Sequence, residues 1–196
     1  MRKRLRKQIC YEQTRNRGTL CGSLAHADPA AELPSVLLAL DGVITVQSSV
    51  KTRRIAARDF FLSYLTTALS SDEIIVEASI PEMPPHAGSC FLEFARKSGD
   101  FAIVGVAALL ALTKDAISDA RLALIGVGDK PWREREFEEK LVGEKGSAER
   151  FDKIAREVAA KIEPGSDIHA SESYRRSLAR VLTRRALTTA WERARA

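Results

Sequence analysis

The sequence predicts an α+β protein in which a small antiparallel sheet is covered by helices. In the second half, short apolar or alternating runs typical of strands come first, and segments with apolar residues at helical spacing come last. At 83–88, two prolines and a glycine mark a change of pattern. We therefore expect a boundary between two structural units at this stretch.

The first half is expected to mix short helices and strands. A helix starts around Pro34, where the fixed φ of proline suits a first turn. Its apolar face holds Val36, Leu37 and Leu40. The other elements expected here are hairpin strands over 42–49 and 51–56, a helix over 57–69 and a strand over 72–82.

The second half is expected to contain a small antiparallel sheet. Its strands are predicted over 89–98, 101–113 and 120–129, with turns at Gly99–Asp100 and 114–119. Periodicity does not decide between strand and helix for 105–112, since the run is apolar throughout.

Three helices are expected to follow these strands. The first spans 130–143, with Pro131 near its start and Gly143 at its end. The second spans 147–162 and is capped by Ser147. The third spans 171–194, with a buried stripe predicted to hold Tyr174, Leu178, Val181 and Leu182.

The positive charge of the chain is concentrated at its start. The 196 residues carry a formal net charge of +5, and five of the 31 basic residues lie among the first seven positions. The remaining basic residues equal the 26 acidic ones, so the excess belongs to a solvated tail and not to the folded surface. Aromatic residues are few and are not interleaved with the basic ones, which argues against a nucleic-acid-binding protein.

Composition also limits the compartment and the kinds of site. The three cysteines are widely spaced and form no CxxC pair, which argues against zinc and a disulfide framework and favours a cytoplasmic location. No apolar run reaches the length of a membrane span, and the basic start lacks the apolar core of a secretory signal. His26, His86 and His169 lie in polar sequence without a ligand-spaced cluster or a partner nucleophile.

The segment 14–34 is the strongest candidate for a binding site. Gly18 and Gly22 are expected to bracket a turn whose successive backbone N–H groups form a concave anion site. Thr19 and Ser23 add hydroxyl groups of the kind that hold a phosphate or a sugar. An ordinary polar turn remains the alternative, because glycine-rich turns are common.

Two further polar segments interrupt the apolar pattern. The segment 95–105 places Arg96, Lys97 and a Gly-Asp turn between two strands, and can be a solvated hairpin or a loop that meets a ligand or partner subunit. The segment 165–176 is a polar loop before a basic helix face, which can dock a partner or simply lead into the helix cap.

These segments, in order, resemble the flavin-binding medium subunit of the molybdenum hydroxylases. The similarity rests on 15–34, 96–110 and 166–187, and it extends from about Gln13 to Trp191. The nearest members are the medium chain of aerobic carbon monoxide dehydrogenase and its xanthine-dehydrogenase-like relatives.

The resemblance implies a domain division and a set of FAD contacts. The division is a basic lead-in at 1–12, the second FAD-binding subdomain at 13–82, a linker at 83–88 and the C-terminal α+β domain at 89–196. Residues implied to line FAD are Thr19, Cys21, Gly22, Ser23 and Ala27, with Glu32 orienting the cofactor. Residues implied to lie near the flavin or its edge are Ile75, Val76, Lys97 and Asp100.

The resemblance also implies a role in electron transfer. In this family, electrons pass from a molybdenum centre on a large subunit, through iron–sulfur clusters on a small subunit, to FAD and then to an acceptor. A first FAD-binding subdomain with its own pyrophosphate loop precedes the region matched here, and no such unit fits before Gln13. We therefore expect the isolated chain to bind FAD weakly or not at all and to be inactive alone. The alternative is a non-catalytic assembly module that docks onto the other subunits without FAD.

Overall fold

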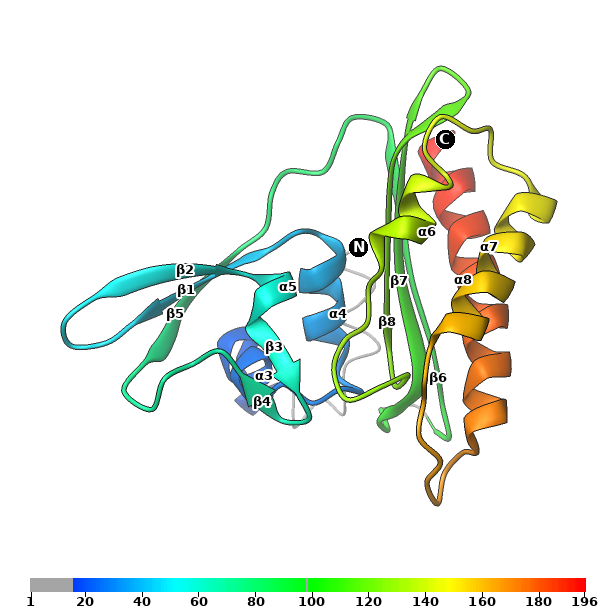
Figure 1. Ribbon diagram of the computed structural model, residues 1–196. Coiled ribbons are helices and arrows are strands. Elements are labelled where there is room, and N and C mark those ends of the chain that lie inside the picture. The colour runs from blue at the N-terminus through cyan, green and yellow to red at the C-terminus, as the bar shows by residue number, and fades with distance from the viewer. Residues whose placement is uncertain (1–15, 98) are drawn as a thin grey trace.

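The computed structural model describes residues 16–97 and 99–196 (Figure 1). The expected basic lead-in at 1–12, with Cys10, lies outside the described residues. The first-half elements are α3 (Leu20–His26), α4 (Glu32–Ala39), β1 (Val43–Gln47), β2 (Thr52–Ala56), α5 (Ala57–Phe60), β3 (Phe61–Ser63), β4 (Thr66–Thr67) and β5 (Ile74–Ser79). The second-half elements are β6 (Ala87–Ala95), β7 (Ala102–Thr113), β8 (Ala116–Ile125), α6 (Arg135–Glu139), α7 (Ala148–Lys161) and α8 (Glu172–Ala194).

The centre of the fold is an antiparallel sheet in the order β6-β7-β8. Helices α7 and α8 lie on one side of this sheet, and α4 with the other first-half elements lies on the opposite side (Figure 1). Because β7 is the middle strand and is covered on both faces, every residue from Ala102 to Leu112 is buried. The continuous apolar run is therefore a strand, and the helical alternative for 105–112 is wrong.

Helix α8 approaches β6 more closely than bulky side chains would permit. A Cβ atom added to Gly88 would lie 2.0 Å from the Ala190 carbonyl oxygen and 2.3 Å from the Ala194 nitrogen. The residues of α8 turned toward the sheet include Ala179, Ala186 and Ala190, with Leu182 between them. The predicted stripe is wrong in part, since the side chains of Tyr174 and Val181 are 43% and 37% exposed. Small residues set the contact, and the bulkier ones turn outward.

The connections of the second half differ in length from those predicted. Ser147 caps α7 as expected, accepting a hydrogen bond from the Arg150 amide at 3.2 Å. The turn is only Lys114–Asp115, because β8 already begins at Ala116. Helix α6 is also shorter than predicted, since Trp132 forms an isolated extended bridge with Leu124 that a helix cannot make.

The small first-half sheet has the order β2-β1-β5. The predicted hairpin is confirmed, with Val43 opposite Ala56 and Gln47 opposite Thr52. The strand predicted over 72–82 is also present, as β5.

The helix predicted over 57–69 is wrong beyond Phe60. Phe60 and Phe61 are both buried, with their ring centroids 5.2 Å apart. Phe61 has extended backbone, with φ of −88° and ψ of 111°, so the helix ends between the two buried rings. A hydrogen bond of 2.7 Å from Arg53 Nη2 to the Ala68 carbonyl then holds the end of this segment beside β2.

Helix α4 joins the two halves of the chain. All its residues from Pro34 to Ala39 are buried, not only one face, because α4 packs between the small first-half elements and strands β7 and β8. Arg133 fixes its C-terminal end by donating to the Leu38 carbonyl and to Asp41 Oδ1, at 2.5 and 2.8 Å. The same guanidinium forms an ion pair of 2.7 Å with Glu138. Residues from before and after the predicted linker at 83–88 therefore pack together in one continuous layer.

Replacement of Gly88 by alanine tests the close approach of α8. We expect Gly88→Ala to lower the free energy of unfolding by about 2–4 kcal/mol, because the added methyl group meets backbone atoms that cannot rotate away. Chemical denaturation measures this change. Gly128→Ala is the matched control, since an added Cβ atom there has no heavy atom within 4 Å. Equal effects of the two substitutions would contradict the explanation.

The ion pair between Arg53 and Glu73 predicts a specific sensitivity to acid. Hydrogen bonds from Arg53, and then from the Ser70 amide, lower the pKa of Glu73 to about 2. A depressed pKa in the folded state stabilises the protein above the unfolded value of about 4.3, and this contribution disappears as pH falls toward 2.

We therefore expect Glu73→Gln to lower the urea midpoint at neutral pH, and the difference from the parent chain to shrink at about pH 3. Glu77→Gln is the control, because Glu77 lies exposed on β5, the strand that begins one residue after Glu73. A deficit of constant size at all pH values would show that the ion pair is not the cause.

Candidate functional site

The predicted turn near residue 20 is the start of helix α3. The expectation of a glycine turn is wrong here, because Thr19 acts as an N-cap and the following residues adopt helical backbone. Thr19 Oγ1 accepts a hydrogen bond of 3.0 Å from the Gly22 amide. The amides of Leu20 and Cys21 have no acceptor within the helix, since the first turn of any helix leaves such donors free. The segment thus still presents backbone N–H groups, by a different geometry.

Gly22 is the residue that permits the cap. A Cβ atom at Gly22 would lie 2.8 Å from Thr19 Oγ1, so a larger residue would displace the capping hydroxyl. Cys21 lies in the first turn with helical backbone, which accommodates its side chain. The Cys21 and Ser23 side chains are partly buried, while Gly22 is exposed.

The loop from α3 to α4 is held to the end of β8. Ala27 ends α3 in the left-handed region with φ of 53°, and its amide donates to the Ser23 carbonyl at 3.2 Å. Asp28 Oδ1 accepts from the Ala30 amide at 2.8 Å. The Pro29 carbonyl accepts from the Gly126 amide at 3.0 Å, which joins this loop to the large sheet.

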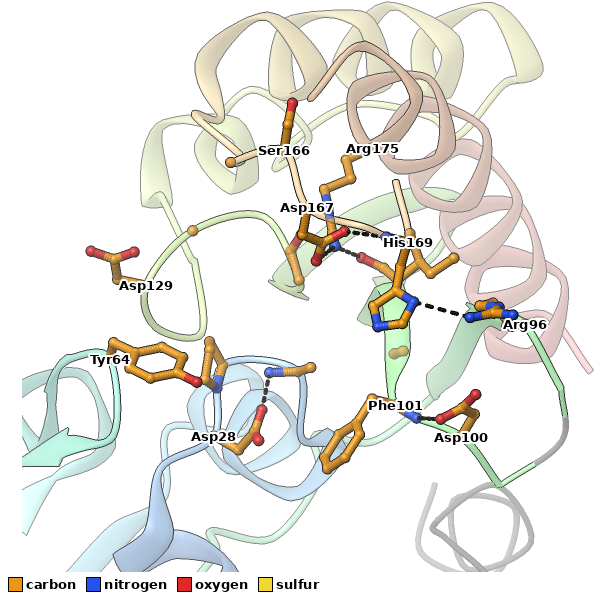
Figure 2. Close-up of a pocket in the computed structure, with 17 residues that line it drawn as sticks. Asp28, Tyr64, Arg96, Asp100, Phe101, Asp129, Ser166, Asp167, His169 and Arg175 are labelled. Carbon is orange, nitrogen blue, oxygen red and sulfur yellow. Dashed lines mark hydrogen bonds and ion pairs between the residues drawn. The ribbon is translucent and has the colours of Figure 1, made fainter. Parts of the chain in front are cut away.

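A cavity of about 520 Å³ opens beside this loop. Figure 2 shows Asp28 and Tyr64 on one side of it, with Arg96 and His169 facing each other on the opposite side. Tyr64 and Phe101 contribute aromatic rings to the lining. These two residues are 61% and 66% exposed. A cavity of this volume, with aromatic walls and a few polar groups, has the character of a small-molecule site.

Arg175 shapes the inner wall of this cavity. Its guanidinium is buried and donates to the carbonyls of Ile103 and Gly126, at 2.5 and 3.1 Å. It also forms an ion pair of 2.6 Å with Asp167, whose other oxygen accepts from the amides of His169 and Ala170. One side chain therefore ties β7, the end of β8 and the loop before α8 together.

His169 is oriented by Arg96. The Arg96 guanidinium lies 3.2 Å from His169 Nδ1. Because a guanidinium can only donate, His169 Nδ1 is the acceptor of this hydrogen bond. This pair offers hydrogen-bond donors to the cavity.

Glu32 at the start of α4 and Glu93 on β6 both have raised pKa values. Burial, as the largest cause, raises the pKa of Glu32, and the negative charge of Asp28 raises it further. Burial also raises the pKa of Glu93 on β6 to about 7, and Glu32 contributes to that shift. Glu93 Oε2 is buried without a hydrogen-bond partner among the described residues.

The structure brings some of the predicted site residues together. Thr19, Cys21, Gly22 and Ser23 share the first turn of α3, Ala27 ends this helix, and Glu32 begins α4. Ile75 and Val76 lie on β5, the strand that packs against α3. Asp100 lines the cavity, whereas Lys97 is exposed and lies outside its lining.

Sequence reasoning missed several of the residues that shape the site. Asp28 and Glu93 had no local signal that separated them from ordinary polar residues. Tyr64 lies in 57–69, where the sequence predicts a helix, but the helix ends at Phe60. Phe101 and Arg175 lie inside the two polar segments, 95–105 and 165–176, that the sequence did single out as candidate loops.

Within residues 16–97 and 99–196, no group of three or more His, Cys, Asp and Glu side chains is arranged to hold a metal ion. In this same part of the chain, none of the helices combines the length and apolar character needed to cross a membrane.

Two family patterns match the chain and together account for most of it. The FAD binding domain in molybdopterin dehydrogenase matches residues 2–83, and the CO dehydrogenase flavoprotein C-terminal domain matches residues 89–190.

Named relatives agree with these patterns. The chain is 42% identical over 187 residues to the nicotine 6-hydroxylase medium subunit of Paenarthrobacter nicotinovorans, covering 95% of this chain and 65% of that protein. It is 38% identical to the 6-hydroxypseudooxynicotine dehydrogenase complex subunit alpha of the same organism, covering 95% of this chain and 64% of that protein. The chain therefore spans somewhat less than two thirds of these relatives.

Solved structures show the same architecture. A carbon monoxide dehydrogenase chain from Hydrogenophaga pseudoflava superposes with a TM-score of 0.92 at 30% identity, covering 95% of this chain and 65% of that one. A chain of quinoline 2-oxidoreductase from Pseudomonas putida 86 gives a TM-score of 0.92 at 34% identity, covering 98% and 67%. The expected α+β fold and the resemblance are thus confirmed: the chain belongs to the family of FAD-binding medium subunits of the molybdenum hydroxylases.

Proposed function

We propose that this chain forms the second FAD-binding lobe and the C-terminal domain of an electron-transferring medium subunit. The observation that carries this proposal is the capped start of α3, since it places free backbone amides, a hydroxyl and a glycine on one exposed turn. Helix N-termini of this kind bind phosphate groups, and FAD contains a diphosphate. Family membership makes FAD the expected ligand.

The residues of the chain fit such a cofactor in three respects. The first turn of α3 can approach a phosphate closely, because Gly22 has no side chain. The cavity beside the α3–α4 loop is large enough for a planar ring and offers Tyr64 and Phe101 as apolar surfaces. Glu93 Oε2 is buried and accepts no hydrogen bond from the described residues, so it is free to accept one from a ligand.

Each predicted residue has a defined role in this proposal. Thr19, Cys21, Gly22 and Ser23 hold the phosphate end, and Ala27 shapes the turn that follows. Glu32 orients the nucleotide, Ile75 and Val76 contribute apolar contact, and Lys97 and Asp100 lie at the cofactor edge. When bound, FAD supplies the redox chemistry, and the protein supplies its binding and orientation.

We further propose that the chain works inside a larger complex. Relatives are named as medium subunits or medium chains, so a molybdenum-cofactor large subunit and an iron–sulfur small subunit are the proposed partners. A companion segment, matching the part of these relatives outside the aligned region, would supply further FAD contacts. Loss of about 4 kcal/mol of such contacts would weaken binding roughly a thousandfold, so the chain alone should bind FAD weakly.

Co-expression tests the proposal. The chain is produced together with a companion FAD lobe and with large and small subunits of a relative, and the purified complex is examined for visible flavin absorbance. Flavin bound in proportion to this chain supports the proposal. A complex that assembles without flavin would contradict it and would favour the assembly-module alternative instead.

Removal of the cap should weaken FAD binding. We expect Thr19→Ala to raise the Kd for FAD about 5- to 10-fold in the complex, since loss of an N-cap costs about 1 kcal/mol and a phosphate-facing hydroxyl is also lost. Fluorescence titration with FAD measures the change.

Two further variants separate this effect from a general loss of stability. Thr19→Ser keeps the capping hydroxyl and should bind FAD nearly as well as the parent chain. Thr52→Ala is the control, because Thr52 lies exposed at the start of β2, outside the proposed FAD contacts. Unchanged affinity in Thr19→Ala would show that α3 does not hold the phosphates.

A further inference from the structure

Arg175 lies where the two walls of the cavity meet the large sheet. Its Nη1 atom donates to the Ile103 carbonyl at 2.5 Å and to the Gly126 carbonyl at 3.1 Å. The two carbonyls converge on one nitrogen because Gly126 passes very close to Ile103: a Cβ atom on Gly126 would lie 2.2 Å from the Ile103 carbonyl oxygen. The guanidinium has further donors in the same rigid plane, so it can hold another partner at a fixed angle.

The first wall of the cavity, the α3–α4 loop, is connected to Arg175 through Gly126. The Gly126 amide donates to the Pro29 carbonyl at 3.0 Å, while the Gly126 carbonyl accepts from Arg175. Pro29 and its neighbours Asp28 and Ala30 line the cavity. The position of this wall therefore depends on a residue that Arg175 holds in place.

The second wall, the loop before α8 (165–170), is connected to Arg175 through Asp167. Arg175 Nη2 and Asp167 Oδ2 form an ion pair of 2.6 Å. Asp167 Oδ1 accepts from the amides of His169 and Ala170, at 2.8 and 2.9 Å, so this carboxylate also fixes the backbone of the loop. Figure 2 shows Arg175 and Asp167 together, on the side of the cavity opposite Asp28.

The charges of the lining indicate which part of FAD suits this cavity. The lining holds four aspartates, against two arginines and one histidine, so it is acidic whichever charge the histidine carries. An acidic lining repels a diphosphate. The isoalloxazine ring of oxidised FAD is uncharged, and its apolar edge suits the exposed rings of Tyr64 and Phe101. The cavity thus favours the flavin ring, whereas the amides at the start of α3 favour the diphosphate.

We propose that Arg175 is a positioning residue for the flavin ring: by holding the α3–α4 loop and the loop 165–170 to one guanidinium, it sets the width of the cavity between them. The proposal rests on the proposed function, in which FAD is the ligand. Without Arg175, the two walls lose their shared attachment and must be ordered when the ring binds, which weakens binding. The start of α3 is held separately, because α3 packs against β5 and α4.

A lysine at position 175 tests this role, because it keeps the positive charge but cannot bind two carbonyls and a carboxylate in one plane. In the complex of this chain with its companion FAD lobe, we expect Arg175→Lys to raise the Kd for FAD about tenfold and to leave the Kd for ADP unchanged. ADP carries the diphosphate and lacks the flavin ring, so the ratio of the two constants separates the cavity from the α3 turn. Calorimetric titration with each ligand measures both constants.

Arg176 provides a matched control on the same helix. Its guanidinium also binds two carbonyls and a carboxylate, those of Ala159 at 3.0 Å, Ala160 at 3.2 Å and Glu172 at 3.0 Å. These bonds join α8 to α7, and Arg176 lies outside the lining of the cavity. Arg176→Lys should therefore leave the Kd values for FAD and for ADP unchanged.

The outcomes are distinct. A loss of affinity that is confined to FAD and to Arg175→Lys supports the proposal. An unchanged Kd for FAD, an equal loss for FAD and ADP, or the same selective loss in Arg176→Lys would overturn it. If the parent complex binds no FAD, the proposed function itself fails, so the two failures are distinguishable.

Asp167→Asn decides the matter if Arg175→Lys does not fold. The asparagine has nearly the same shape and keeps an oxygen that can accept from the His169 and Ala170 amides, while the ion pair with Arg175 is lost. We expect a rise of about threefold in the Kd for FAD, since only one wall is released, and an unchanged Kd for ADP. Unchanged affinity for FAD in this variant would overturn the proposal.

A second measurement needs no FAD, because hydrogen–deuterium exchange of the chain reports how often each wall opens. Arg175→Lys should speed exchange of the Gly126, His169 and Ala170 amides about fivefold, since the attachments that hold these segments are weakened. Arg176→Lys should leave these rates as they are in the parent chain. Unchanged exchange at all three amides in Arg175→Lys would show that Arg175 holds neither wall.

Discussion

The packing of α4 against the large sheet is the constraint on which the rest of this structure depends. Its residues from Pro34 to Ala39 fill the space between the first-half elements and strands β7 and β8. An eight-residue helix is too short to be stable alone, so tertiary contacts must fix it. Arg133 completes this arrangement by binding the Leu38 carbonyl at the negative end of the helix.

The candidate site follows from where α4 is held. Because α4 is fixed on the sheet, the loop before it must cross the end of β8. The hydrogen bond from the Gly126 amide to the Pro29 carbonyl holds the loop at this crossing. Helix α3, with its capped first turn, adjoins the other end of the same short loop. The cavity and the position of the α3 amides are thus two consequences of one packing arrangement.

The buried polar side chains near the candidate site differ in how far their hydrogen-bonding groups find partners. The Arg175 guanidinium binds two carbonyls and Asp167 within the cavity wall. Glu93, by contrast, has a buried oxygen that no described residue satisfies. A buried polar atom without a partner carries a local cost in stability, and proteins accept such costs most often at functional sites.

Much of the fold was determined by local sequence. The hairpin of β1 and β2, the strands of the large sheet and the Ser147 cap of α7 were predictable because alternation, turn residues and capping act within a few positions. What only the tertiary structure decided was the helical form of α3, the rotation of α8 that buries Ala186 instead of Val181, and the cavity that brings Asp28, Phe101 and Arg175 together. These depend on contacts between segments far apart in the chain, and no local pattern contains the identity of a distant neighbour.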